Sequence, residues 1–144
     1  MSLLFDAVYT LGYAILGVIM MLLGNRIIDA FIPGDFPTEI KRGNRAVAWL
    51  CAGSYIGIGL LVRTAIVDPM GSSLVEHSLW RGLMTSVFYT FLGIIAFMIS
   101  YRIVDTWHRP YSLSQEIMRG NVAAGIVVFG LFVGLALVIS GAIY

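Results

Sequence analysis

The sequence predicts an all-α, polytopic membrane protein with four transmembrane helices, arranged as two parallel two-helix repeats. Two observations support this fold class. The 144 residues are 59% hydrophobic and only 12% charged, whereas about a quarter of the residues of a soluble domain carry a charge. Similar blocks also recur in the same order in the two halves of the chain, which indicates an internal repeat.

Four stretches without a charged residue predict the four spans. Together with their flanking residues they reach the roughly 20 residues that a helix needs to cross a bilayer. Backbone groups in lipid must be hydrogen-bonded internally, so we expect these spans to be helical. The predicted spans lie at about residues 8–30, 44–66, 81–103 and 120–143.

The internal repeat covers most of the chain. Residues 13–17 and 26–29 resemble the segments that follow them by 76 residues, and residues 39–44 resemble the segment that follows by 77. Each unit contains two spans, so both units start on the same side of the membrane, and the repeats are parallel. The predicted organisation is a first repeat over residues 1–68, a periplasmic loop over residues 69–79 and a second repeat over residues 80–144.

The positions of lysine and arginine predict the orientation. Only Arg63 and Arg81 lie on one side of the membrane, and the other seven basic residues lie in or beside the first and third loops. Short loops rich in lysine and arginine stay in the cytoplasm, so both termini should be periplasmic in a bacterial inner membrane. Asp6 precedes the first span and no basic residue precedes Arg26, so we expect no signal peptide.

The same polar motif precedes the second span of each repeat. Its residues are Glu39, Arg42, Gly43 and Asn44 in the first repeat and Glu116, Arg119, Gly120 and Asn121 in the second. We expect each glutamate to lie in the first turn of a helix and to pair with the arginine three residues later. Pro37 and the capping-box spacing of Ser112 and Gln115 are the expected helix starts.

Two interpretations of these loops stay open. In the first, the charged residues cap helices and snorkel at the membrane interface. In the second, loops 31–43 and 104–119 form a docking site for a cytoplasmic partner or an ion-entry ring. Two further pairs, Arg26 with Asp29 and Arg102 with Asp105, are expected to be structural ion pairs at the membrane edge, where pairing lowers the cost of two charges.

Small residues define a packing face on the second helix of each repeat. Gly53 and Gly57 form a small-x-x-x-small pattern, and so do Gly130 and Gly134 at the matching positions. Such faces let helix backbones approach closely in lipid. Ala46 and Ala123 extend the two faces, together with Gly43, Leu50, Gly120, Val127 and Gly141.

The repeated asparagines point away from the glycine faces. At about 100° per residue, Asn44 shares a side with Ala48, Cys51 and Tyr55, and Asn121 shares a side with Gly125, Val128 and Phe132. Each helix therefore has two packing faces, one to close the four-helix unit and one to meet a second subunit or line a pore mouth. The alternative is that each amide bonds a nearby helix or loop carbonyl, because a buried amide needs partners.

The paired blocks resemble those of the YjfL-like bacterial inner-membrane proteins, a family of unknown function. Proteins of that family resemble this chain because they have two tandem two-helix units. Each unit has a Glu-Ile-x-x-(Gly/Asn)-Asn-x-Ala-Ala block before its second helix. The block at residues 116–124 fits fully, and the block at residues 39–47 departs from it only at Val47. The resemblance implies four spans in the inner membrane and implies no reaction, substrate or cofactor.

The pattern of reactive residues does not predict an enzyme. His77 and His108 fall on opposite predicted sides of the membrane, and Cys51 has no histidine near it in the sequence. We therefore expect no catalytic residue, metal site or cofactor. The net charge of +1 gives no indication of nucleic-acid binding.

Two functional hypotheses follow. The first is a non-enzymatic oligomeric membrane module or an accessory or scaffold subunit, embedded in the lipid bilayer and packed against copies of itself or other membrane subunits. The alternative is a homo-oligomeric channel or permease for a small ion or neutral solute. In that case the pore would be lined by Asn44, Asn121, Tyr13, Tyr89 or the serine and threonine residues Ser54, Thr85, Ser86 and Thr90.

Overall fold

A computed structural model describes residues 3–67, 79–107 and 112–143. In these ranges the chain is entirely helical, with α1 (Leu3–Phe31), α2 (Phe36–Lys41), α3 (Arg45–Val67), α4 (Leu79–Trp107), α5 (Leu113–Met118) and α6 (Val122–Ile143). Four helices are long and apolar enough to cross a membrane, over Ala7–Phe31, Arg45–Ile66, Trp80–Trp107 and Val122–Ala142. The predicted all-α, four-span fold class is confirmed.

Some of the predicted features lie outside the described residues. These are the predicted periplasmic loop, apart from its last residue Leu79, which begins α4, and the two histidines, His77 and His108.

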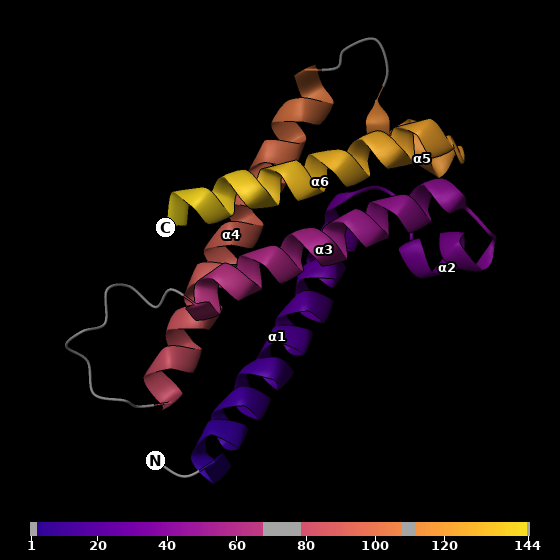
Figure 1. The fold of residues 1–144 in the computed structure, drawn as a ribbon. Helices are drawn as coiled ribbons and strands as arrows, with labels where there is room; N and C mark the ends of the chain where they lie inside the picture. Colours follow the sequence, from indigo (N-terminus) through magenta and orange to yellow (C-terminus); the bar gives the residue numbers. More distant parts are fainter. Residues whose placement is uncertain (1–2, 68–78, 108–111, 144) are drawn as a thin grey trace.

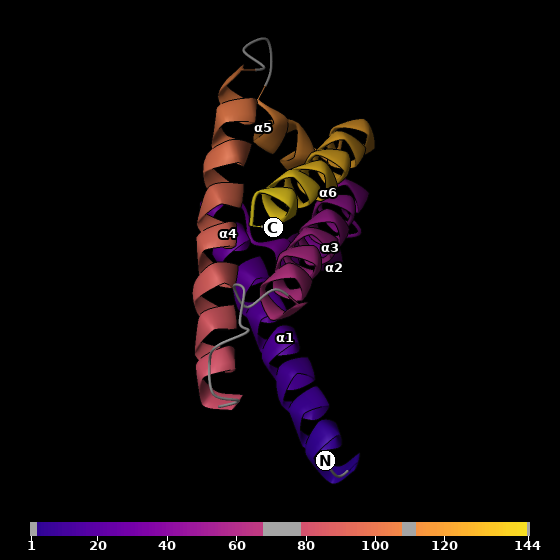
Figure 2. The ribbon, with the colours of Figure 1, turned by 60° about the vertical axis from the view of Figure 1, so that its left-hand side comes forward.

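Each repeat consists of a long helix, a short helix and a second long helix. Figures 1 and 2 show α3 and α6 side by side and running in the same direction, with α2 and α5 at the end where both begin. The first helices of the repeats, α1 and α4, also run in a common direction and cross this pair. The two repeats are therefore parallel in space as well as in sequence.

Helix α3 lies at the centre of the molecule and contacts every other helix. In its most hydrophobic 18 residues 56% are buried, whereas the corresponding share of α1 is 11%. The N-terminal half of α1 projects away from the other helices (Figure 2). The largest fully buried side chains gather around α3 and include Leu50, Ile58, Leu61, Phe97 and Phe132.

The closest packing joins α3 to α6, where the two backbones meet. A Cβ on Gly53 would lie 2.7 Å from the Phe129 Cα, and a Cβ on Gly125 would lie 2.5 Å from the Ala46 carbonyl oxygen. Beside this contact, the rings of Trp49 and Phe129 meet edge to face at 5.3 Å. Only glycine permits so close an approach, because any side chain would have to displace a backbone.

The two glycine faces identified in the sequence have different surroundings. Gly53 and Gly57 are covered by α6, and a Cβ on Gly57 would also meet the Phe97 ring at 2.9 Å. A Cβ on Gly130 or Gly134 would meet nothing within 4 Å. The α6 surface that packs on α3 is instead the side of Gly125, Val128 and Phe132, which the sequence analysis assigned to Asn121.

The packing of the two repeats on one another is therefore asymmetric. Helix α3 of the first repeat packs against α4, α5 and α6 of the second. Helix α6 packs against α3 but makes no comparable contact with α1 or α2 within the described ranges. The second long helix of the first repeat, α3, thus packs against all three helices of the second repeat. The equivalent packing of α6 against α1 and α2 is absent among the described residues.

Replacing Gly125 with alanine should destabilise the protein. The added methyl group meets backbone atoms of Ala46, which cannot rotate away, and such overpacking costs about 1–3 kcal/mol. The measurement is thermal unfolding of the detergent-solubilised protein. The matched control is Gly12→Ala in α1, where the methyl group meets nothing within 4 Å and helix propensity alone favours alanine by up to about 1 kcal/mol. Equal melting temperatures for the two variants would contradict the close approach.

Candidate functional site

The repeated Glu-Ile-x-Arg-Gly-Asn segments form two turns with the same backbone hydrogen bonds. In the first turn Gly43 N–H donates to the Ile40 carbonyl and Asn44 N–H to the Glu39 carbonyl, both at 3.0 Å. In the second turn Gly120 and Asn121 donate in the same way to Ile117 and Glu116, both at 3.0 Å. This is the Schellman pattern that ends a helix, and it requires a positive φ at its glycine. Gly43 has φ 80° and Gly120 has φ 85°.

Each asparagine then starts the next long helix. The Asn44 Oδ1 accepts hydrogen bonds from Ala46 N–H at 3.0 Å and Val47 N–H at 3.3 Å. The Asn121 Oδ1 accepts from Ala123 N–H at 3.1 Å and Ala124 N–H at 3.5 Å. These bonds satisfy amides that have no partner within the helix. The residues that follow each asparagine therefore donate their backbone N–H groups to its side chain.

The glutamate of each turn orients the asparagine. Asn44 Nδ2 donates to Glu39 Oε2 at 2.9 Å, and Asn121 Nδ2 donates to Glu116 Oε2 at the same distance. The other carboxylate oxygen pairs with Arg42 or Arg119 at 3.0 Å. The asparagine hydrogen bond, followed by the arginine, lowers the pKa of both glutamates from the ordinary value of this side chain. Both carboxylates are thus held ionised, and each fixes the amide so that its oxygen faces the helix.

The aspartates near the ends of α1 and α4 do not form the expected ion pairs. Asp29 Oδ1 accepts from the Phe36 N–H and Asp105 Oδ1 accepts from the Leu113 N–H, each at 3.0 Å. In the described part of the chain the ion pairs are those of Glu39 and Glu116, and neither Arg26 nor Arg102 bonds an aspartate. Phe36 and Leu113 are buried, and their amides have no partner inside their short helices, so the carboxylates serve these amides in place of the arginines.

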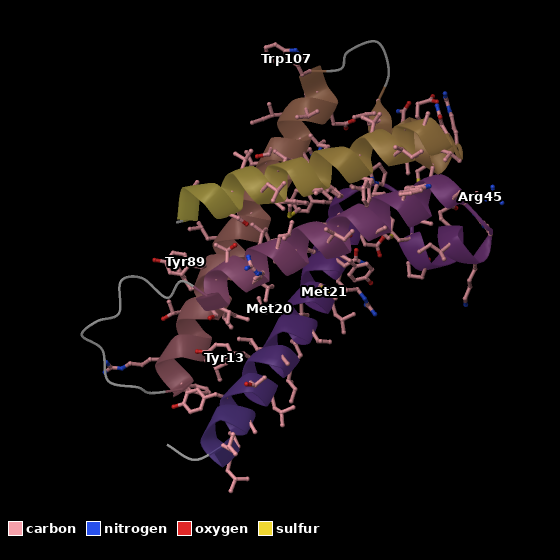
Figure 3. All side chains as sticks on the ribbon, viewed as in Figure 1. Tyr13, Met20, Met21, Arg45, Tyr89 and Trp107 are labelled. Carbon is pink, nitrogen blue, oxygen red and sulfur yellow. The ribbon has the colours of Figure 1, made fainter. Side chains whose placement is uncertain are left out.

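Arg102 has a different partner. Its guanidinium lies over the Phe31 ring, 5.7 Å from the centroid, within the range of a cation–π contact. This contact joins the end of α4 to the end of α1. The corresponding end of the second repeat carries Trp107, which lies at the tip of α4 away from the other helices (Figure 3).

The two turns differ in one respect. Asn44 Nδ2 also donates to the carbonyl of Ile117 at 3.1 Å and lies 3.5 Å from that of Met118, so the first turn is hydrogen-bonded to the second. Within the described part of the chain, the hydrogen bonds of the Asn121 side chain stay within its own turn and the helix that it caps. Asn44 is partly buried by this contact, whereas Asn121 is exposed.

A polar cluster in the first repeat was missed in the sequence analysis. Asn25 of α1 accepts a hydrogen bond from Ser54 Oγ at 2.6 Å and donates to Tyr55 Oη at 3.2 Å. The second repeat has Tyr101, Leu131 and Phe132 at these positions, and Tyr101 instead bonds Ser114 Oγ at 3.0 Å. The available signal was an uncharged amide inside a predicted span, which must find a partner on a neighbouring helix.

The remaining candidate polar residues have structural contacts. Ser86 Oγ donates to the Ala65 carbonyl at 3.0 Å, which joins α4 to α3. Tyr13 projects from α1 toward the start of α4, beside Gly82 (Figure 3). Among the described residues, no three histidine, cysteine, aspartate or glutamate side chains lie together in a way that could hold a metal ion.

The chain is similar in sequence to known membrane proteins. Residues 2–143 match the profile of a family described as Domain of Unknown Function (DUF350). A UPF0719 transmembrane protein of Aquifex aeolicus is 22% identical over 95% of this chain and 50% of its own length. The UPF0719 transmembrane protein YshE of Bacillus subtilis is 26% identical over 90% of this chain and 87% of its own length.

The matched region is about half of the Aquifex relative, whereas it is most of the Bacillus relative. No solved structure matches the chain. The narrower resemblance to the YjfL-like proteins stays a prediction.

The two asparagines should differ in their effect on stability. Asn44→Ala and Asn121→Ala each remove a helix cap, which costs about 0.5–2 kcal/mol. Asn44→Ala also leaves the Ile117 carbonyl without its side-chain donor, at a further cost of about 1 kcal/mol. Thermal unfolding of the protein in detergent that keeps it monomeric should therefore give a lower melting temperature for Asn44→Ala.

The serine variants provide the control. Asn44→Ser and Asn121→Ser retain a capping oxygen and lose the amide group, without placing a second carboxylate beside Glu39 or Glu116, so each should recover part of the loss. Equal destabilisation by the two alanine variants would exclude a contribution from the bond between the turns.

Proposed function

Because the chain belongs to the DUF350 family of membrane proteins, we propose that it is a non-enzymatic module of the bacterial inner membrane that works by packing against other membrane-embedded helices. It acts as an oligomeric scaffold or as an accessory subunit. The observation that carries this proposal is the glycine face of α6: its counterpart on α3 is packed against a helix, whereas a Cβ on Gly130 or Gly134 would meet no other part of the described structure within 4 Å.

The apolar surface of the chain supports the same function. Large exposed hydrophobic side chains extend along α1, α4 and α6, as at Ile15, Phe88, Ile99 and Val138. Lipid tails cover such an apolar surface without cost. They provide no hydrophobic force that drives helices together, so helices associate in lipid through close packing at small residues. A stripe of small residues is useful where another helix lies against it.

The polar motif supports a structural role. The hydrogen-bonding groups of Asn44, Asn121 and both glutamates are used in capping and in ordering the turns. Nothing positive among the described residues indicates an enzymatic activity. The arginines Arg42 and Arg119, whose side chains are largely exposed, are the groups available to a partner in the cytoplasm at loops 31–43 and 104–119.

A channel or permease is the second candidate. The observation in its favour is an open groove between α1 and α3 that contains Tyr13 and Arg63 among apolar residues. Asn44 contributes less to this hypothesis than the sequence suggested, because its amide is occupied by the turn. A pore would require several copies around a common axis.

The proposed orientation places both turns in the cytoplasm and both termini in the periplasm. A cysteine at Thr38, in a chain that carries Cys51→Ala, should react with a membrane-impermeant maleimide in inverted inner-membrane vesicles and resist it in spheroplasts. Thr38 lies in α2 and bonds Asp35 at the surface, so the substitution leaves the core intact. Labelling in spheroplasts would reverse the orientation.

Oligomeric state and ion flux test the proposed function together. Native mass spectrometry of the protein released from membrane vesicles should give multiples of 15.8 kDa, or a complex with another membrane subunit. Reconstituted liposomes should show no ion flux above that of empty liposomes under either a potassium or a proton gradient. A solitary monomer in the membrane would refute the module, and a reproducible current would favour the channel.

A further inference from the structure

We propose that copies of this chain assemble head to tail in the membrane. In this assembly α6 of one copy lies against the groove between α1 and α3 of the next copy, as α3 lies against α4 and α6 within the chain. The inference rests on the proposed function. It identifies the partner as a second copy of the chain, and the two contacting surfaces as α6 and the groove between α1 and α3.

The first step is the direction of the contact between the repeats. Gly53 of α3 meets the backbone of Phe129 on α6, and Leu61 of α3 lies 3.3 Å from the Cβ position of Gly93 on α4. A symmetric contact would also bring Gly130 to Ala52 and Val138 to Gly17, which are the corresponding positions in the sequence. A Cβ on Gly130 would meet nothing within 4 Å. The two repeats therefore meet through different surfaces. The α3 surface used by the first repeat has an unpaired equivalent on α6, and the surface used by the second repeat has an unpaired equivalent between α1 and α3.

The first unused surface is on α6. It consists of the glycine face at Gly130 and Gly134 and the adjacent Val138. Val138 is 71% exposed, whereas Leu61, its counterpart on α3, is 0% exposed because α4 covers it. This face thus has the composition of the buried α3 face and lacks only a helix pair to lie against.

The second unused surface is the groove between α1 and α3. It has a volume of about 380 Å³ and is lined by Gly17, Met21, Gly59 and Val62, among others. Gly17 corresponds to Gly93, and Met21 corresponds to Phe97, whose ring lies 2.9 Å from the Cβ position of Gly57. The groove therefore matches the surface that receives α3 inside the chain. In the assembly it would receive Val138 and Gly134.

The turns supply an independent argument. Asn44 reaches the carbonyls of Ile117 and Met118 on the other repeat. By the same relation, Asn121 of one copy would reach the carbonyls of Ile40 and Lys41 on the next. The side chains agree, because Ile117 is 0% exposed beneath α3 while Ile40 is 47% exposed. An exposed isoleucine in a short polar helix is explained if a neighbouring copy covers it.

A third relation joins the ends of the long helices. Arg102 of α4 lies over the Phe31 ring of α1. The corresponding pair is Arg26 and Trp107, and within the chain Trp107 is 83% exposed. In the assembly Arg26 of the next copy would lie over the Trp107 indole. Tryptophan is the best ring for such a contact, so the substitution of phenylalanine by tryptophan suits this position.

The helix faces, the asparagine turns and the arginine–aromatic pairs are each in contact from the first repeat to the second, and each lacks the equivalent contact from the second repeat to the first. All three are completed by the same arrangement of a neighbouring copy. A contact between two different surfaces leaves both surfaces free at the ends, so each copy can add another. Such contacts form rings when the rotation closes. Because the repeats are parallel, the rotation axis runs along the membrane normal, and every copy keeps the same orientation in the bilayer.

Disulfide trapping tests this inference. In a chain carrying Cys51→Ala, we place cysteines at Ala52 and Gly130, the positions that correspond to Phe129 and Gly53. Because a Cβ on Gly53 would lie 2.7 Å from the Phe129 Cα, the two Cα atoms at the corresponding contact lie slightly closer than the range of about 4.4–6.8 Å that a disulfide requires. A small separation of the two copies, which no peptide chain joins, brings the cysteines into that range. Mild oxidation of membranes should convert most of the Ala52→Cys/Gly130→Cys protein into dimers and higher species, and either single variant should stay at the monomer mass.

Two controls make the result specific. The pair Gly17→Cys/Val138→Cys should give the same species through the other side of the groove, so a folding defect in one pair does not decide the outcome. The pair Leu92→Cys/Gly130→Cys should give none, because the exposed Leu92 lies on α4, outside both surfaces. Without oxidation, Gly130→Leu should shift the native mass to the monomer, and Gly12→Leu should not.

The outcomes separate the inference from the proposed function. Crosslinking by Gly130→Cys alone would mean a symmetric dimer, and an oligomer that neither double variant can trap would mean other surfaces; both results overturn the head-to-tail assembly and leave the proposed module standing. A monomeric wild-type chain in native membranes would remove both. Trapping by both pairs, with silent single variants, supports the assembly.

Discussion

The close approach of α3 and α6 is the constraint on which the rest of the structure depends. In lipid no hydrophobic force drives two apolar helices together, so association relies on dispersion and on the distance between backbones. Gly53 and Gly125 reduce that distance until a single added carbon would meet main-chain atoms. Helix α3 also lies against α4, so α3 is the centre of the molecule, whereas α1 of the same repeat stays largely exposed.

The two turns bring the helices to this contact in register. Each turn ends a short helix at a glycine of positive φ and caps the next long helix with an asparagine. Asp29 and Asp105 tie the start of each short helix back to the preceding span. The residues that stand out in the sequence thus satisfy backbone amides, and the candidate site is an architectural element.

The repeats have diverged in their contacts more than in their sequence. The same glycine pattern is buried on α3 and uncovered on α6, and the same asparagine bonds a second repeat in one turn and only its own turn in the other. A two-repeat chain whose repeats meet through different surfaces must leave one surface of each kind unfilled. These unfilled surfaces are buried only when other helices pack against them, and this is the physical basis of the proposed function.

The sequence by itself determined the four spans, the parallel repeat and the helix cap at Ser112, because hydropathy, internal similarity and local capping patterns can all be recognised along the chain. It did not identify Asn44 and Asn121 as helix caps. It misassigned the partners of Asp29 and Asp105, because Arg26 and Arg102 were nearer along the chain than the amides of Phe36 and Leu113. It also could not distinguish Gly53 from Gly130, which have the same local pattern. Only the tertiary structure decided which glycine face is filled, since that depends on which surface of α6 turns toward α3.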